Sequence, residues 1–78
     1  MKPMHIAECV RDNLEGYLVD LGRNEPGGMY DMLISVVEKP LLEVVMQRTD
    51  NNQSKAALWL GLNRNTLRKK LLEHKLID

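Results

Sequence analysis

The chain has 78 residues, with 11 basic and 11 acidic side chains, a formal net charge of +0 and one cysteine. This length allows one domain and lies near the lower limit for a self-sufficient hydrophobic core. A single cysteine excludes an internal disulfide framework, and His5 and His74 are too far apart in sequence for a zinc-binding spacing. Association with a second chain is the remaining way to stabilise so small a core. There is no secretory signal and no apolar run of the ~20 residues that a membrane span needs, so we expect a cytoplasmic protein without membrane contact.

Charge is distributed unevenly along this neutral chain. Residues 1–49 hold 5 basic and 8 acidic side chains, whereas residues 50–78 hold 6 basic and 3 acidic ones. Between Lys55 and Lys70 there are five cations and no carboxylate. Because attraction to phosphate depends on the local field rather than on total charge, this distribution favours nucleic-acid binding by the C-terminal part.

The first predicted element is an amphipathic helix from about residue 5 to about residue 22. Its apolar arc consists of Ile6, Val10, Leu14, Tyr17, Leu18 and Leu21. Cys9 borders this arc, and we expect it to be a small buried hydrophobe rather than a redox thiol. The segment from Asn24 to Gly28 then ends the helix, because proline and paired glycines oppose its continuation. This linker is too short to separate two domains.

The second predicted helix runs from Met29 to Thr49 and is apolar on two sides. One stripe contains Tyr30, Leu33, Ile34, Val37, Leu41, Val44 and Val45, and the opposite one contains Met32, Val36, Leu42 and Met46. A helix with two apolar faces must be covered twice, which predicts that a second copy of the chain covers one of them. Pro40 lies mid-helix, where it removes a backbone hydrogen bond and should kink the axis. Two helices broken at Lys39 are the alternative.

The third and fourth predicted helices form a hairpin in the sequence NQSKAALWLGLNRNTLRKKL, from Asn52 to Leu71. Asn51-Asn52 caps the third helix, which runs to about Leu60, and Gly61 suits the left-handed residue that ends such a helix. Asn63 caps the fourth. Two helices joined by a short turn with a glycine are typical of the helix-turn-helix, whose second helix enters the DNA major groove.

The chain is therefore predicted to be an all-α single domain of four helices, covering residues 1–78. Residues 1–50 would form a dimerisation scaffold, and residues 51–78 a helix-turn-helix head. Trp59 is expected to fill space between the third helix and the scaffold. His5 and His74, near the chain ends, are expected to be solvated.

The predicted DNA-binding residues are polar or cationic side chains at the starts of the last two helices and along the fourth. They are Asn52, Ser54, Lys55, Asn63, Arg64, Asn65, Thr66, Arg68, Lys69 and Lys70. Arginine near the start of a recognition helix usually reads guanine, whereas lysines and hydroxyls suit phosphate oxygens. The two asparagines, Asn63 and Asn65, could either test adenine or cap the helix. Nothing pairs Cys9 with a histidine, and no close carboxylate pair lies on a shared face near a pocket signal, so we expect no enzyme, metal or cofactor.

Two stretches carry a resemblance to a known family: KPLLEVVMQRT, from Lys39 to Thr49, and the hairpin sequence that follows it. Both resemble the Fis (factor for inversion stimulation) family of bacterial nucleoid-associated DNA-binding proteins. The resemblance implies an intertwined homodimer that bends double-stranded DNA at degenerate sites, organises the nucleoid and regulates transcription. It implies that Arg64 reads a base with Asn63 beside the bases, and it assigns backbone contacts to Asn52, Ser54, Lys55, Thr66, Arg68 and Lys69.

This sequence also departs from the family pattern. Asp50-Asn51 stands where the family usually has Arg-Gly, in the turn through which the resemblance implies RNA polymerase as a further partner. Leu72-Glu73 replaces a lysine pair, and Asn65 replaces a frequent glycine. Two alternatives remain: the DNA-binding output domain of an NtrC-type activator, and a helical adaptor that binds protein instead of DNA.

Overall fold

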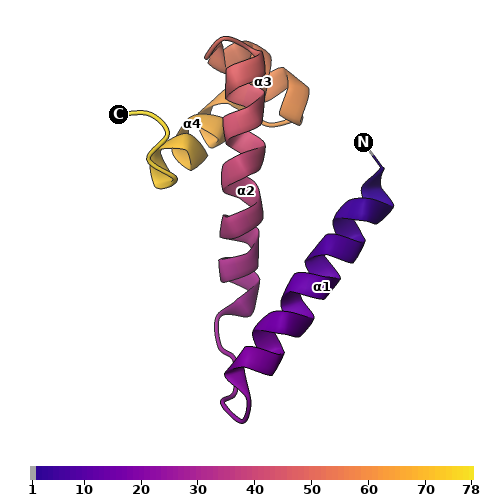
Figure 1. The fold of residues 1–78 in the computed structure, drawn as a ribbon. Helices are drawn as coiled ribbons and strands as arrows, with labels where there is room; N and C mark the ends of the chain where they lie inside the picture. The colour runs from indigo at the N-terminus through magenta and orange to yellow at the C-terminus, as the bar shows by residue number, and fades with distance from the viewer. Residues whose placement is uncertain (1) are drawn as a thin grey trace.

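The computed structural model describes residues 2–78 and contains four helices, with no strand in that range. They are α1 (Pro3–Leu21), α2 (Met29–Arg48), α3 (Gln53–Leu60) and α4 (Arg64–Glu73). The molecule is elongated, because α2 forms a central rod with α3 and α4 gathered at its C-terminal end (Figure 1). The all-α prediction is confirmed, and the helices lie close to their expected positions.

Helix α2 continues without interruption through Pro40. Proline lacks the amide that would bond to the carbonyl of Val36, so one helical hydrogen bond is missing there. The helix nevertheless spans Met29–Arg48 as one element. The alternative of two helices broken at Lys39 is therefore wrong.

The hydrophobic core lies where the end of α2 meets α3 and α4. Its buried members are Leu42 and Met46 from α2, Ala56 and Ala57 from α3, and Leu67 and Leu71 from α4. Val45, Leu60, Leu76 and Ile77 pack against them from the edge. Two alanines on the buried face of α3 let its backbone approach the neighbouring helices closely. This core fixes the head of the molecule on the α2 rod.

The sharp reversal between α2 and α3 is built from three polar residues. Thr49 is buried and donates its hydroxyl to the carbonyl of Val45 at 2.9 Å. Asp50 and Asn51 follow with φ angles of 52° and 62°, in the left-handed region that short polar residues tolerate better than others. The Asn51 amide then donates to the Met46 carbonyl at 2.8 Å. The turn therefore satisfies its own backbone groups.

Helices α1 and α2 diverge with distance from the loop that joins them (Figure 1). No residue of α1 is buried within the single chain. Cys9 is exposed, so the expectation that it is a buried hydrophobe is wrong for one chain. It lines an apolar hollow between the two helices together with Val10, Val36 and Pro40. The scaffold thus presents apolar surface that its own chain does not cover.

Candidate nucleic-acid interface

The turn between α3 and α4 has the backbone geometry of a helix-turn-helix. Gly61 ends α3 with φ 70° and ψ 28°, the left-handed conformation that glycine adopts without a steric cost. The amide of Leu62 donates to the Ala57 carbonyl at 2.9 Å and closes the end of α3. Asn63 then begins the next helix, accepting the Asn65 amide at 2.8 Å. The predicted caps and glycine turn are present.

Helix α4 divides into a buried face and a polar face. Leu67 and Leu71 are fully buried against the core. The side chains predicted to meet DNA along the polar face are all exposed, namely Arg64, Asn65, Thr66, Arg68 and Lys69. Ion pairs within residues 2–78 join only Glu38 to Lys70 and to His74, so the cations of the polar face have no carboxylate partner there. This face is free to attract an anion.

The start of α3 provides a second polar group on the head. The Asn52 side chain accepts the Lys55 amide at 3.0 Å, which makes Asn52 the N-cap. Ser54 and Lys55 are exposed beside it. Free amides and the helix dipole make this end attractive to phosphate.

The position of Trp59 differs from the expected one. The residue is 55% exposed, and the ammonium of Lys55, four residues earlier on the same helix face, lies 5.8 Å from the centroid of its ring. The tryptophan therefore does not fill space between α3 and the scaffold. Alanines occupy the buried side of α3 instead, and they leave no room for a large ring.

Lys70 and His74 point toward α2, unlike the other cations of α4. Lys70 Nζ lies 3.0 Å from Oε2 of Glu38, and His74 Nε2 lies 2.9 Å from Oε1 of the same carboxylate. The exposed fractions of these side chains are 32% for Lys70, 10% for His74 and 18% for Glu38. The expectation that His74 is solvated is therefore wrong, and the Lys70 ammonium is engaged within the chain.

The Glu38 carboxylate responds electrostatically to both partners. The hydrogen bond from His74, followed by that from Lys70, holds the pKa of Glu38 below its ordinary value of 4.5. Sequence reasoning missed this cluster although a signal was present. His74 follows Leu67 and Leu71 at helical spacing, and Glu38 precedes the buried Leu42 by one turn.

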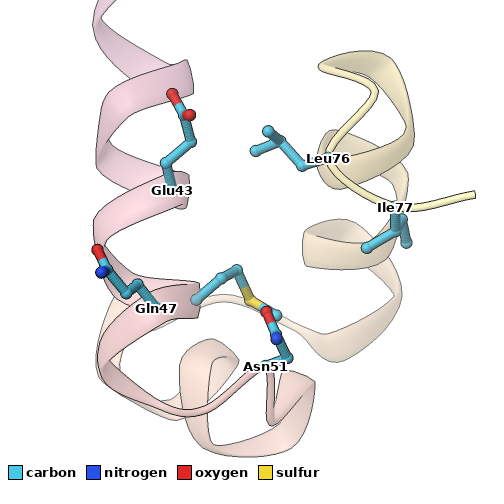
Figure 2. Close-up of a pocket in the computed structure, with 6 residues that line it drawn as sticks. Glu43, Gln47, Asn51, Leu76 and Ile77 are labelled. Atoms are coloured by element: carbon cyan, nitrogen blue, oxygen red, sulfur yellow. The ribbon is translucent and has the colours of Figure 1, made fainter.

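A shallow hollow lies between the end of α2 and the tail that follows α4 (Figure 2). Met46, Leu76 and Ile77 supply its apolar part, while Glu43, Gln47 and Asn51 supply the polar part. Glu43 is its single titratable side chain, so it holds no acid–base pair. Within residues 2–78, no group of three or more His, Cys, Asp or Glu side chains is arranged to hold a metal ion. In the same range, no helix combines the length and apolar character needed to cross a bilayer.

The head and its polar face define a helix-turn-helix protein. The family described as "Bacterial regulatory protein, Fis family" matches residues 34–74, which include the second half of α2 and the whole hairpin. The chain belongs to this Fis family, so the resemblance noted in the sequence is confirmed. Members are regulators rather than enzymes.

Individual relatives cover most of the chain. A Fis-like DNA-binding protein of Neisseria meningitidis is 58% identical over 72 residues, which are 92% of this chain and 91% of the relative. One from Ralstonia nicotianae is 53% identical over 72 residues, 92% of this chain and 94% of the relative. The DNA-binding protein Fis of Psychromonas ingrahamii is 44% identical over 69 residues, 88% of this chain and 70% of the relative.

Proposed function

We propose that this protein binds and bends double-stranded DNA as a homodimer, and that it organises the nucleoid and regulates transcription. The observation that carries the proposal is the polar face of α4, where Arg64, Arg68 and Lys69 are exposed and have no carboxylate partner within residues 2–78. Family membership and the DNA-binding names of the relatives support it. The site of action is then the nucleoid, in the cytoplasm.

The two groups of polar side chains on the head suit different parts of a duplex. Arg64 begins α4, where a guanidinium can grip O6 and N7 of guanine in the major groove. The cap of α3, with Ser54 and Lys55 exposed, suits a phosphate beside that groove. Lys69, one turn and a residue after Arg64, suits a phosphate as well. Together they allow sequence-tolerant binding that depends mostly on charge.

The uncovered apolar surface of the scaffold supports a homodimer. Val36, Val37, Leu41 and Val44 of α2 are exposed in the single chain, and α1 buries no residue at all. Monomeric soluble proteins rarely expose contiguous apolar patches of this kind. A second copy whose first two helices intertwine with α1 and α2 would cover the patch. Cys9 is then exposed in the single chain because the copy that covers this surface is the other subunit.

Bending follows from the proposed dimer. We propose that its two recognition helices lie closer together than one turn of straight DNA, which is roughly 34 Å. The duplex must then curve, and its central minor groove must narrow. Selectivity arises partly from how easily the uncontacted centre deforms, which favours A/T-rich middles. RNA polymerase is a further proposed partner, at the turn formed by Asp50 and Asn51.

Titration of a labelled duplex at several salt concentrations tests DNA binding. If each subunit neutralises ~4 phosphates, log affinity should fall with log salt at a slope of about −7. A slope near zero would contradict the proposal. Circular-permutation gel shifts on A/T-centred duplexes then report the bend, and a mobility independent of site position would exclude bending.

The two alternative functions remain distinguishable. A protein-binding adaptor is favoured by the exposed apolar side chains of Leu58 and Leu72, which face away from the core. An adaptor would show no salt-dependent DNA binding in the same titration. For an NtrC-type output domain, an ATPase domain would precede the chain in the same reading frame. The names of the relatives, which are Fis-like DNA-binding proteins matched over 91% and 94% of their length, favour a Fis-type regulator.

A further inference from the structure

Glu38 joins the recognition helix to the scaffold rod. We propose that Glu38 is a positioning residue for DNA binding, which holds α4 at a fixed angle on α2 through Lys70 and His74. This inference rests on the proposed function for its consequence, because the angle of α4 matters only if α4 reads DNA. The contact itself spans 32 residues of sequence to Lys70 and 36 to His74.

The position of the cluster explains why it controls an angle. Leu67 and Leu71 hold one face of α4 to the core by apolar packing, which is not directional and leaves the helix able to turn slightly. Glu38 lies one turn before the buried Leu42 on α2, toward the N-terminal end of that helix. Its two bonds therefore add a directional polar attachment to this packing, at the last turn and C-cap of α4.

The two hydrogen bonds to Glu38 have an ionised acceptor, which makes them stronger than hydrogen bonds between neutral groups. An ionised carboxylate only accepts, so the Nε2 atom of His74 must carry the hydrogen in its 2.9 Å contact with Glu38. The 3.0 Å contact from Lys70 is an ion pair in a partly buried place, where screening by salt is weaker than on the open surface. Both oxygens of Glu38 are used, one for each partner, so the carboxylate plane is fixed in two directions.

The angle between α2 and α4 determines which DNA sites the proposed dimer can bind. In the proposed dimer, α2 of each subunit carries one head, so the angle between α2 and α4 sets the separation and direction of the two recognition helices. A pivoting α4 would accept duplexes with several half-site spacings, whereas a fixed one prefers a single spacing. Glu38 thus acts on spacing and bend without touching DNA.

The test uses duplexes whose two half-sites differ only in central spacing, by one base pair at a time. For Glu38→Gln we expect affinity for the preferred spacing to fall by roughly threefold to tenfold, the scale of one lost net interaction. Affinity for the other spacings should change less, and the salt slope should stay unchanged. Glu43→Gln is the matched control, because it removes the same charge from an exposed position of α2 without an ion pair in residues 2–78.

A second variant separates positioning from simple stability. His74→Gln keeps a neutral donor for Glu38, so its spacing profile should match that of the unchanged protein, whereas His74→Ala removes the donor and should broaden the profile. An unaltered spacing profile in Glu38→Gln would overturn the proposal. A steeper salt slope with the same profile would also overturn it, since Glu38 would then merely neutralise Lys70.

Amide hydrogen exchange of the free protein supplies a readout that needs no DNA. The last turn of α4, from Lys70 to Glu73, should exchange faster in Glu38→Gln than in Glu43→Gln, because its ion pair with α2 is lost and only apolar packing and neutral hydrogen bonds remain. Equal exchange in the two variants would refute the positioning role. Faster exchange in a protein that shows no salt-dependent DNA binding would uphold the attachment and refute the proposed function instead.

Discussion

The Asn63 side-chain oxygen accepts the backbone amide of Asn65 at 2.8 Å, so the residue proposed to lie beside the bases is also the N-cap of the recognition helix. This bond satisfies one of the amides that the first turn of a helix leaves unpaired. The NH₂ group of the same side chain remains available to a base. Asn63 therefore caps the recognition helix and is also proposed to contact DNA.

Replacing this cap separates its two roles. Asn63→Ala should lower the free energy of unfolding by about 1 kcal/mol, because the Asn65 amide loses its acceptor. Asn63→Asp keeps an acceptor oxygen and should unfold like the unchanged protein in urea. It should nevertheless bind DNA more weakly, since its carboxylate faces phosphates. If both variants unfolded alike, the capping bond would contribute nothing measurable.

The two adjacent leucines of α4 should respond very differently to truncation. Leu71 is fully buried, so Leu71→Ala should cost about 2–5 kcal/mol of unfolding free energy through lost burial and a residual cavity. Leu72 is 45% exposed, and Leu72→Ala should stay within about 0.5 kcal/mol. Thermal and urea unfolding measure both. A large effect at Leu72 would mean that it is covered, by a partner chain or by another surface.

Base reading and phosphate binding can be told apart on α4. Arg64→Ala should cost ~1–3 kcal/mol of binding energy and relax the preference at one base pair in each half-site. Lys69→Ala should weaken binding to all sequences alike and make the salt slope shallower by about 1 for each subunit. Titrations on a small panel of single-base variants measure both effects. Identical behaviour of the two variants would show that the roles assigned here are wrong.

Local sequence signals predict the helices and caps well. Asn52, Gly61 and Asn63 each act through backbone groups within a few residues, so their identity alone indicates where helices begin and end. The buried face of α4 follows likewise from the helical spacing of Leu67 and Leu71. Signals of this kind need no knowledge of the tertiary arrangement.

Side chains whose surroundings come from distant segments were harder to predict. His74 lies near the chain end, yet Glu38, 36 residues earlier, receives its ring. Trp59 stays exposed because small alanines already fill the space beneath α3, which depends on how closely the helices approach. The predicted apolar arc of α1 has no buried member within one chain, and its Ile6 and Leu18 are exposed. Periodicity does not say which surface covers an arc, and within one chain nothing buries Cys9.

Acid should selectively weaken the attachment made by Glu38. Its pKa is lowered in the folded protein by the hydrogen bond from His74, then by that from Lys70, relative to 4.5 in an unfolded chain. A carboxylate whose pKa is lower in the folded state stabilises the fold at pH values above its unfolded-state pKa. This contribution is lost as pH falls through its folded-state pKa. The free energy of unfolding should therefore decline less for Glu38→Gln than for the unchanged protein as pH falls below 4.5.

Urea unfolding between about pH 6 and pH 3 measures this difference, since ionised carboxyl groups take up protons in that window. Other carboxylates titrate in both proteins and cancel in the comparison. Glu43→Gln is again the control, because its carboxylate has no ion-pair partner within residues 2–78. Parallel curves for the unchanged protein and Glu38→Gln would mean that neither His74 nor Lys70 stabilises the charged form of Glu38.

A charge placed on the uncovered stripe of α2 should abolish the proposed dimer. Val37 is 43% exposed in the single chain and lies away from the core, so Val37→Glu costs a single chain little. In a dimer the same carboxylate would be buried without a partner, which is strongly unfavourable. At micromolar concentrations the unchanged protein should sediment at twice the chain mass of 9.0 kDa, and Val37→Glu near that mass itself. Gln47→Glu adds the same charge at an exposed polar position of α2 and should remain dimeric. Unchanged protein that sediments as single chains would remove the scaffold on which paired DNA recognition depends.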